Sequence, residues 1–189
     1  MLDPLPMVTI ALALAALFGA SLVQKLHALS EWPGIVRNYR LVPDALAGAV
    51  GVVLLCAEGL TAAALLWTPL RSAGGAAAAV LLALYAAAIG INLARGRTHI
   101  TCGCFGSRLG QGIGAWMVWR NGLLALLALA LWLPVSPRAM SVAELCVALA
   151  AMITLGFLYP VLAVVARSAP PTFEQNFRAS AAADARRSS

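Results

Sequence analysis

The chain has 189 residues, of which 62% are hydrophobic and only 11% are charged, and its mean hydropathy is +0.89. A soluble domain of this size carries about 25% charged residues, so the composition excludes an ordinary soluble globular protein. The net charge of +6 does not indicate nucleic-acid binding, because no basic cluster with interleaved aromatic residues occurs in a polar segment. The composition therefore predicts an all-α, polytopic transmembrane helical bundle.

Five apolar runs are long enough, or nearly long enough, to cross a bilayer, which takes about 20 residues. They are Met7–Gln24, Ala45–Trp67, Ala76–Ala94, Val118–Leu133 and Val142–Ala166, and the fourth is the shortest. The first follows Asp3 and has no preceding Lys or Arg, so it lacks the positive n-region of a secretory signal, and we interpret it as a retained helix. We predict about five spanning helices within a bundle of residues 1–166, followed by a disordered C-terminal tail over 167–189.

The connections between these runs differ in character. After the first run, a segment with apolar residues at helical spacing predicts a short helix in the membrane interface, with Ser30 as its cap and Pro33 in its first turn. Tight turns around Pro69–Gly75 and Pro134–Met140 favour antiparallel neighbours. Tryptophans near the ends of the runs favour an aromatic belt at the headgroups.

The basic residues are distributed unequally between the two sides that five helices would create. One side would carry Lys25, Arg37, Arg40, Arg95, Arg97, Arg108, Arg120, Arg167, Arg178, Arg186 and Arg187, and the other only Arg71 and Arg138. Because cytoplasmic loops are enriched in Lys and Arg, the N-terminus is predicted to be periplasmic and the C-terminus cytoplasmic.

Most of the candidate chemistry lies in the loop Arg95–Gly114, which is longer than a simple connector needs to be and rich in glycine. Cys102 and Cys104 flank a single glycine, and a disulfide between them would close a small ring and be easily reduced. Nearby arginines would favour the thiolate, and His99 could move protons or orient a thiol. The pattern favours thiol–disulfide exchange.

Two alternatives remain for this loop. The cysteines could be inert or permanently joined, or they could bind a soft metal such as Cu(I) together with His99. Their spacing is poor for zinc, which favours two to four residues between cysteines. Metal binding is therefore the weaker hypothesis.

Other polar residues occur within or beside the apolar runs. Cys56 and Cys146 are interpreted as small hydrophobic residues, with a role as auxiliary thiols as the alternative. Lys25 and Glu58 are ionisable groups of a kind that is usually paired or functional in a membrane. At about 1.5 Å per residue, Glu58 would lie roughly 20 Å above Lys25, so the spacing argues against a direct bond. We expect Lys25 to snorkel or to meet the interfacial helix, and Glu58 to be protonated or paired elsewhere.

Several of these residues recur in a known pattern. It comprises Lys25-Leu26, Tyr39-Arg40-Leu41-Val42-Pro43, Glu58, Asn92-Leu93-Ala94-Arg95-Gly96-Arg97, Ile100-Thr101-Cys102-Gly103-Cys104-Phe105-Gly106 and Trp119-Arg120-Asn121. This pattern resembles the methylamine utilisation protein MauE family over about residues 7–165, and it is distantly similar to DoxX-like and vitamin K epoxide reductase-like membrane redox proteins.

The resemblance implies a bacterial inner-membrane protein that, with a thioredoxin-like partner, assists maturation of the methylamine dehydrogenase small (β) subunit, a periplasmic disulfide-rich client. Together with the cysteine spacing, we interpret Cys102 and Cys104 as the exchanging pair, with a quinone or a thioredoxin-like protein as the other redox partner. A thiol–disulfide oxidoreductase is therefore the candidate activity, and a non-cycling membrane scaffold is the alternative.

The predicted topology conflicts with this role, because the charge count places the cysteine pair on the cytoplasmic side whereas the client is periplasmic. Either the loop folds back between helices, or one run does not span, or electrons cross the membrane. These three alternatives stay open at the level of sequence.

Overall fold

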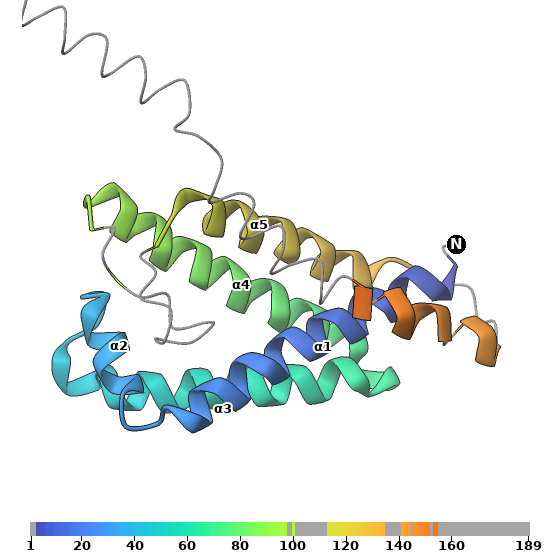
Figure 1. Ribbon diagram of the computed structural model, residues 1–189, viewed down its shortest axis with the longest axis horizontal. Helices are drawn as coiled ribbons and strands as arrows, with labels where there is room; N and C mark the ends of the chain where they lie inside the picture. The colour runs from blue at the N-terminus through green and yellow to red at the C-terminus, as the bar shows by residue number, and fades with distance from the viewer. Residues whose placement is uncertain are drawn as a thin grey trace, which may run out of the picture. The chain divides into compact units, whose positions relative to one another are not determined.

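Four long apolar helices dominate the computed structural model, which describes residues 3–97, 100, 113–134, 141–144, 146–151 and 153–154 (Figure 1). The elements are α1 (Pro4–His27), α2 (Trp32–Asn38), η1 (Asp44–Leu46), α3 (Ala47–Leu66), η2 (Thr68–Leu70), α4 (Arg71–Ala94), α5 (Ala115–Leu129) and η4 (Ala130–Trp132). The described residues contain no strand. They fall into two units, Met1–Ala148 and Leu149–Ser189, and the described part of the second unit is helical.

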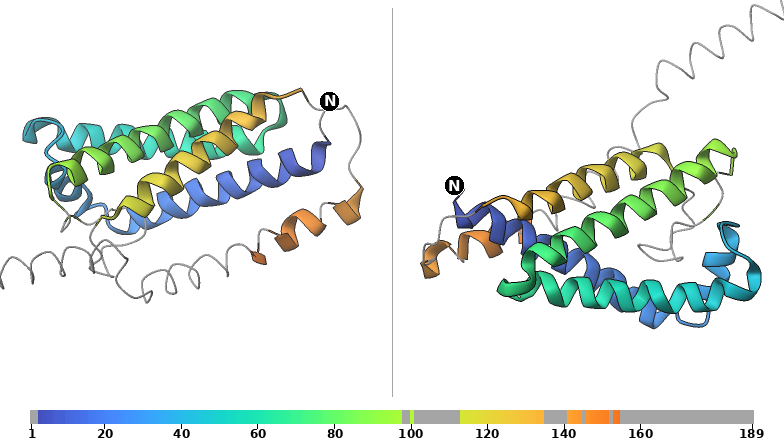
Figure 2. Two further views of the ribbon diagram at one scale, coloured as in Figure 1. Left: turned by 90° about the horizontal axis from the view of Figure 1, so that it is seen from above. Right: turned by 180° about the vertical axis from the view of Figure 1, so that it is seen from behind.

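The four long helices run antiparallel in chain order within the first unit. Helix α1 packs against α3, α3 against α4, and α4 against α5, as the views from two further directions also show (Figure 2). The C-terminal end of α1, the short helix α2, the end of α4 and the start of α5 therefore lie at the same end of the bundle (Figure 1). This end also carries both stems of the loop that contains the cysteine pair.

The prediction of membrane-spanning helices is confirmed for the first four runs. Candidate spans cover Pro4–His27, Asp44–Leu66, Thr68–Ala94 and Ala115–Trp132, each long and apolar enough to cross a bilayer. The fifth run begins with a shorter apolar helix, Val142–Ala151, and the rest of it lies outside the described residues. The predicted tail, 167–189, also lies outside them.

The turn between α3 and α4 differs from the prediction. It is confined to Thr68–Leu70, and α4 begins at Arg71, so Gly74 and Gly75 lie inside a helix rather than in the turn. A Cβ atom on Gly74 would lie 2.8 Å from the backbone nitrogen of Leu65, and one on Gly75 would lie 2.8 Å from a carbonyl oxygen of α5. These glycines therefore serve the close approach of α4 to both neighbours, as small residues do in membrane bundles.

The short helix predicted after the first run is present as α2, although its predicted cap is wrong. Glu31 occupies the N-cap position and makes no side-chain capping bond, and Pro33 lies in the first turn, where a missing N–H is tolerated. Ser30 precedes the helix and does not cap it. The first turn of α1, in contrast, is capped by the side chain of Asp3, which accepts a hydrogen bond from Leu5 N at 3.0 Å.

The surface of the bundle is apolar as well as its core. Buried residues of α1, α3, α4 and α5 form a shared hydrophobic core around Phe18 and Leu82. Large apolar side chains also point outward, including Val53 and Leu60 of α3. Four tryptophans are exposed, as a headgroup belt requires, but Trp32 is buried and belongs to the site described next.

Candidate functional site

A buried ion pair joins the C-terminal end of α1 to the middle of α3. The ammonium group of Lys25 on α1 donates to the Oε1 atom of Glu58 on α3, and the two side chains are 1% and 0% exposed. The expectation that depth would keep these two residues apart is therefore wrong. The pair is enclosed in the bundle, where each charge depends on the other for compensation.

Two hydroxyl groups complete the environment of the carboxylate. The hydroxyl of Tyr85 on α4 donates to Glu58 Oε1 at 2.5 Å and lies 3.3 Å from the Lys25 ammonium nitrogen. Ser21, one turn before Lys25 on α1, approaches Oε1 and Oε2 of Glu58 at 3.4 and 3.5 Å, which is long for a hydroxyl donor. We call Ser21, Lys25, Glu58 and Tyr85 the carboxylate cluster, and it joins α1, α3 and α4.

The position of α2 explains why the depth argument failed. The argument assumed that α1 ends level with the first residue of α3. Instead, Trp32 of α2 packs against the second turn of α3, with its indole N–H donating to the carbonyl oxygen of Gly51 at 3.2 Å. The first turns of α3 therefore extend past the end of α1 and are covered by α2, so Lys25 comes level with Glu58. A Cβ atom on Gly51 would lie 2.9 Å from Trp32 Cδ1, and only glycine allows this approach.

The same tryptophan helps to compensate the lysine charge. The Lys25 ammonium lies 4.5 Å from the centroid of the Trp32 ring and 5.1 Å from that of the Tyr85 ring. Both distances are within the range of cation–π attraction, which is strongest for desolvated cations. The expectation that Lys25 meets the interfacial helix is thus confirmed.

Helix α5 contributes two further polar residues on the other side of the cluster. Asn121 is 2% exposed, and its Oδ1 atom accepts from the guanidinium of Arg120 at 3.3 Å. Arg120 also lies over the ring of Trp116, 5.3 Å from its centroid. A small void separates these residues from Ser21 and Glu58. Both were predicted from the sequence as polar residues of the membrane region.

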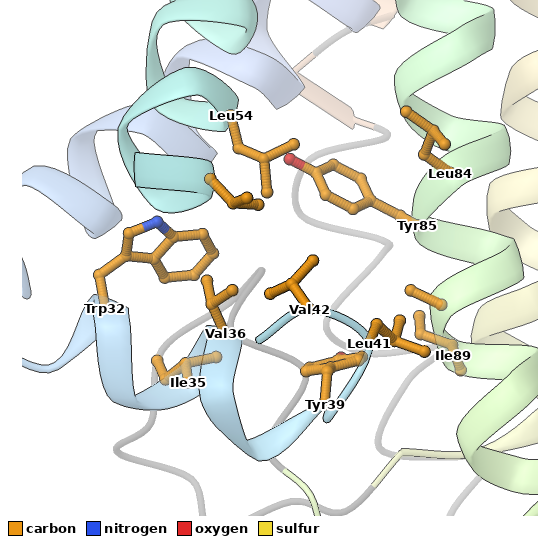
Figure 3. Close-up of a pocket in the computed structure, with 12 residues that line it drawn as sticks. Trp32, Ile35, Val36, Tyr39, Leu41, Val42, Leu54, Leu84, Tyr85 and Ile89 are labelled. Atoms are coloured by element: carbon orange, nitrogen blue, oxygen red, sulfur yellow. The ribbon is translucent and has the colours of Figure 1, made fainter. Parts of the chain in front are cut away.

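A larger apolar cavity lies next to the carboxylate cluster. It has a volume of about 280 Å³ and lies between α2, the segment that follows it, α3 and α4. Figure 3 shows Trp32 and Tyr85 at opposite walls of this cavity, with Tyr39 and Ile89 at its far end. Its lining is almost entirely hydrocarbon or aromatic, because the indole N–H bonds to Gly51 and the Tyr85 hydroxyl bonds to Glu58. The cavity therefore suits an apolar or aromatic group.

The stems of the long loop are held at this end of the bundle. The N–H of Ile113 donates to the carbonyl oxygen of Ile100 at 3.1 Å and closes the base of the loop. Ile113 packs with Ile89 and Met117, and Tyr39 packs against the same cluster. The far end of the apolar cavity therefore adjoins the base of the loop.

Polar contacts reinforce this base. Arg95 donates to the carbonyl oxygen of Arg40 at 3.3 Å, and Arg40 has a positive φ of 48°. Arg97 bonds to Asn92 through both its main chain, at 3.0 Å, and its side chain, at 3.2 Å. Of the predicted site residues, Tyr39 and Arg40 are thus brought to the loop base rather than to the carboxylate cluster.

The remaining predicted residues fall outside these contacts. His99, Cys102 and Cys104 lie outside the described residues, as does the metal site proposed for them. Cys56 and Cys146 are free and exposed on the apolar surface of their helices. Their interpretation as small hydrophobic residues stays a prediction.

Sequence reasoning missed two members of the carboxylate cluster. Ser21 and Tyr85 lie inside apolar runs and carry no charge, so neither was recognised as a polar site residue. A weak signal existed, because each is a hydrogen-bonding side chain in a segment that is otherwise largely apolar. Polar groups at such positions require partners, since lipid offers none.

Comparisons with known proteins identify relatives of this chain. The family profile described as methylamine utilisation protein MauE matches residues 4–135. A methylamine utilization protein MauE of Paracoccus denitrificans is 41% identical over 131 residues, covering 69% of this chain and 70% of the relative. The protein of the same name from Methylophilus methylotrophus is 34% identical over 161 residues, covering 83% and 84%. No solved structure matches the chain.

Proposed function

This chain belongs to the methylamine utilisation protein MauE family, and from that premise we propose that it is a multi-pass membrane protein that exchanges thiols and disulfides during maturation of a periplasmic client. By the resemblance of its motifs, the client is the disulfide-rich small (β) subunit of methylamine dehydrogenase. A thioredoxin-like protein is the proposed redox partner. Cys102 and Cys104 are the proposed exchanging pair.

The observation that carries this proposal is the anchored base of the cysteine loop. The bond between Ile113 and Ile100 ties both ends of the loop to the bundle end that holds the apolar cavity. Two residues of chain reach at most about 7 Å, so Cys102 is tethered near Ile100 by connectivity alone. Arg95 and Arg97 are anchored at the same base, and their positive charge favours a nearby thiolate.

The proposed step is an exchange in which a thiolate of the client attacks the Cys102–Cys104 disulfide. A mixed disulfide forms, and the second client thiolate then displaces the protein cysteine. The client gains a disulfide, and the cysteine pair gains two electrons and two protons. The thioredoxin-like partner, in its disulfide form, reoxidises the pair by the same exchange in reverse.

A lipid-soluble quinone is the alternative oxidant, and the apolar cavity fits such a ring. Trp32, Tyr39 and Tyr85 supply flat aromatic walls, and the volume of about 280 Å³ suits a substituted ring with the start of its chain. When bound, a quinone would supply an acceptor for two electrons and two protons. The chain itself would exclude water from the ring and hold the Tyr85 hydroxyl against Glu58.

The proposal is tested by replacing each cysteine of the pair. Cys102→Ser and Cys104→Ser should each abolish disulfide formation in the client. The measurement is alkylation of the client's free thiols in cells that produce the client together with each variant. Cys56→Ser and Cys146→Ser are matched controls, because these thiols are exposed on the helix surfaces, and they should leave the client unchanged.

The same experiment distinguishes thiol–disulfide exchange from the alternative role of a non-cycling scaffold. If the client matures normally with both Cys102→Ser and Cys104→Ser, while loss of the whole chain blocks maturation, the protein acts as a non-cycling scaffold and thiol exchange is refuted. Mixed-disulfide capture of the client by a single-serine variant would support exchange directly.

The charge count predicts a periplasmic N-terminus and a cysteine pair on the cytoplasmic side, whereas direct exchange with a periplasmic client requires the pair to be reached from the periplasm. Membrane-impermeant thiol reagents applied to intact cells test this separately. Labelling of Cys102 or Cys104 from outside would refute the orientation without refuting thiol exchange, because it would place the pair on the same side as the client.

A further inference from the structure

A small void at the centre of the bundle has the size of a water site, and polar side chains contribute to its wall. It lies between all four long helices, and its polar lining residues are Ser21, Glu58, Tyr85, Arg120 and Asn121. The volume of the void is about 20 Å³. One water needs about 10–15 Å³ by this measure, so the void accepts a single water and little else.

The amide of Asn121 provides an independent reason to expect a ligand there. Its side chain is 2% exposed, and its Nδ2 atom has no hydrogen-bond partner in the part of the chain that the structure describes. Exchanging the two amide atoms would not remove the problem, because Nδ2 would then face the donor guanidinium of Arg120, which now bonds to Oδ1. The orphaned group is therefore a donor on the side of α5 that lines the void.

The opposite wall of the void offers an acceptor. Glu58 is fully buried, and its Oε2 atom has only the long contact of 3.5 Å from the Ser21 hydroxyl among the bonds described above, whereas Oε1 receives Lys25 and Tyr85. A carboxylate oxygen can accept two hydrogen bonds. Polar voids that present a donor and an acceptor fill with water, whereas apolar ones of similar size stay dry.

We propose that this void binds one ordered water molecule, which accepts a hydrogen bond from Asn121 Nδ2 and donates one to the carboxylate of Glu58. The water links the carboxylate cluster of α1, α3 and α4 to α5. A continuous chain of hydrogen bonds then runs from Lys25 through Glu58 and the water to Asn121. Asn121 is a positioning residue in this arrangement, because it acts on the carboxylate through the water.

The proposal is tested on the full chain purified in lipid nanodiscs. A density map that shows ordered waters should contain one peak within hydrogen-bond distance, about 2.7–3.2 Å, of Asn121 Nδ2 and a Glu58 oxygen. An empty void in the wild-type map would overturn the proposal, and this measurement does not depend on any variant folding.

A spectroscopic test examines the effect on Glu58. The infrared carboxylate band of this residue is identified by its loss in Glu58→Gln. Asn121→Leu should shift that band, because the water loses its donor and leaves. Asn92→Leu is the matched control: Asn92 is also a fully buried asparagine, but its amide bonds to Ala88 and Arg97 and does not line the void. An unchanged band in Asn121→Leu, or an equal shift in the control, would refute the coupling.

Discussion

Removing one charge of the buried Lys25–Glu58 pair should destabilise the bundle, and the loss of stability should depend on which of the two charges is removed. Glu58→Leu leaves the Lys25 ammonium, whose side chain is 1% exposed, without its carboxylate. An uncompensated buried charge of this kind costs about 3–5 kcal/mol. At about 1.4 kcal/mol for each factor of ten, the folding equilibrium should fall roughly a hundredfold to several thousandfold.

Lys25→Met should be less harmful than Glu58→Leu. The carboxylate then keeps the hydrogen bond from Tyr85 and the weaker approach of Ser21. We expect a loss near the lower end of about 3–5 kcal/mol, because the buried carboxylate loses its cation but keeps hydrogen-bond donors. The double variant Lys25→Met/Glu58→Leu should recover most of the loss, and adding Tyr85→Phe should recover more of it, because Ser21 is then the one member of the carboxylate cluster that still lacks its Glu58 partner.

The assay is reversible unfolding of the purified protein in mixed micelles, followed by far-ultraviolet circular dichroism during titration with a denaturing detergent. The double-variant cycle yields the coupling energy between Lys25 and Glu58 directly. Cys56→Ser serves as a control on the exposed surface of α3. Additive losses, with no recovery in the double variant, would show that the two charges do not interact and would refute the structure of the cluster.

Three further substitutions test the packing around this cluster. Gly51→Ala should cost about 1–3 kcal/mol in the same unfolding assay, because its Cβ would meet Trp32 at 2.9 Å, whereas Gly48→Ala, which meets nothing within 4 Å, should be neutral or slightly stabilising. Gly75→Ala should also cost about 1–3 kcal/mol, because the added Cβ would force α4 away from the backbone of α5. Equal unfolding stabilities of Gly75→Ala and Gly48→Ala would contradict this close approach. Trp32→Leu should remove about 2 kcal/mol of cation–π stabilisation from Lys25, and an unchanged unfolding midpoint would show that the ring does not compensate the charge.

The positions of the spanning helices were predictable because lipid imposes a simple condition. A chain that crosses a bilayer must satisfy its backbone internally, so long apolar runs become helices and their bounds follow composition. Asp44–Leu66 and Ala115–Trp132, for example, lie close to the runs predicted for them. Gly74 and Gly75 were misassigned to a turn because glycine permits both tight turns and close helix contacts, and the local sequence does not distinguish the two.

The candidate site was predictable only in part. Lys25, Glu58 and Asn121 were recognisable because ionisable and amide groups are rare in apolar runs. Their partnership was not recognisable, because it depends on how far the connection through α2 shifts α3 along α1. Tyr85 carried no charge to mark it, although it touches both members of the ion pair.

Local composition and spacing were enough to predict the long apolar helices, the short helix after the first of them and the glycine-rich segment with its cysteine pair. Only the tertiary structure decided that Lys25 meets Glu58, that Tyr85 joins them, and that an apolar cavity lies between this cluster and the base of the loop. The physical reason is that hydropathy determines which segments enter the membrane, whereas their relative depth and facing sides are set by close contacts such as Trp32 on Gly51.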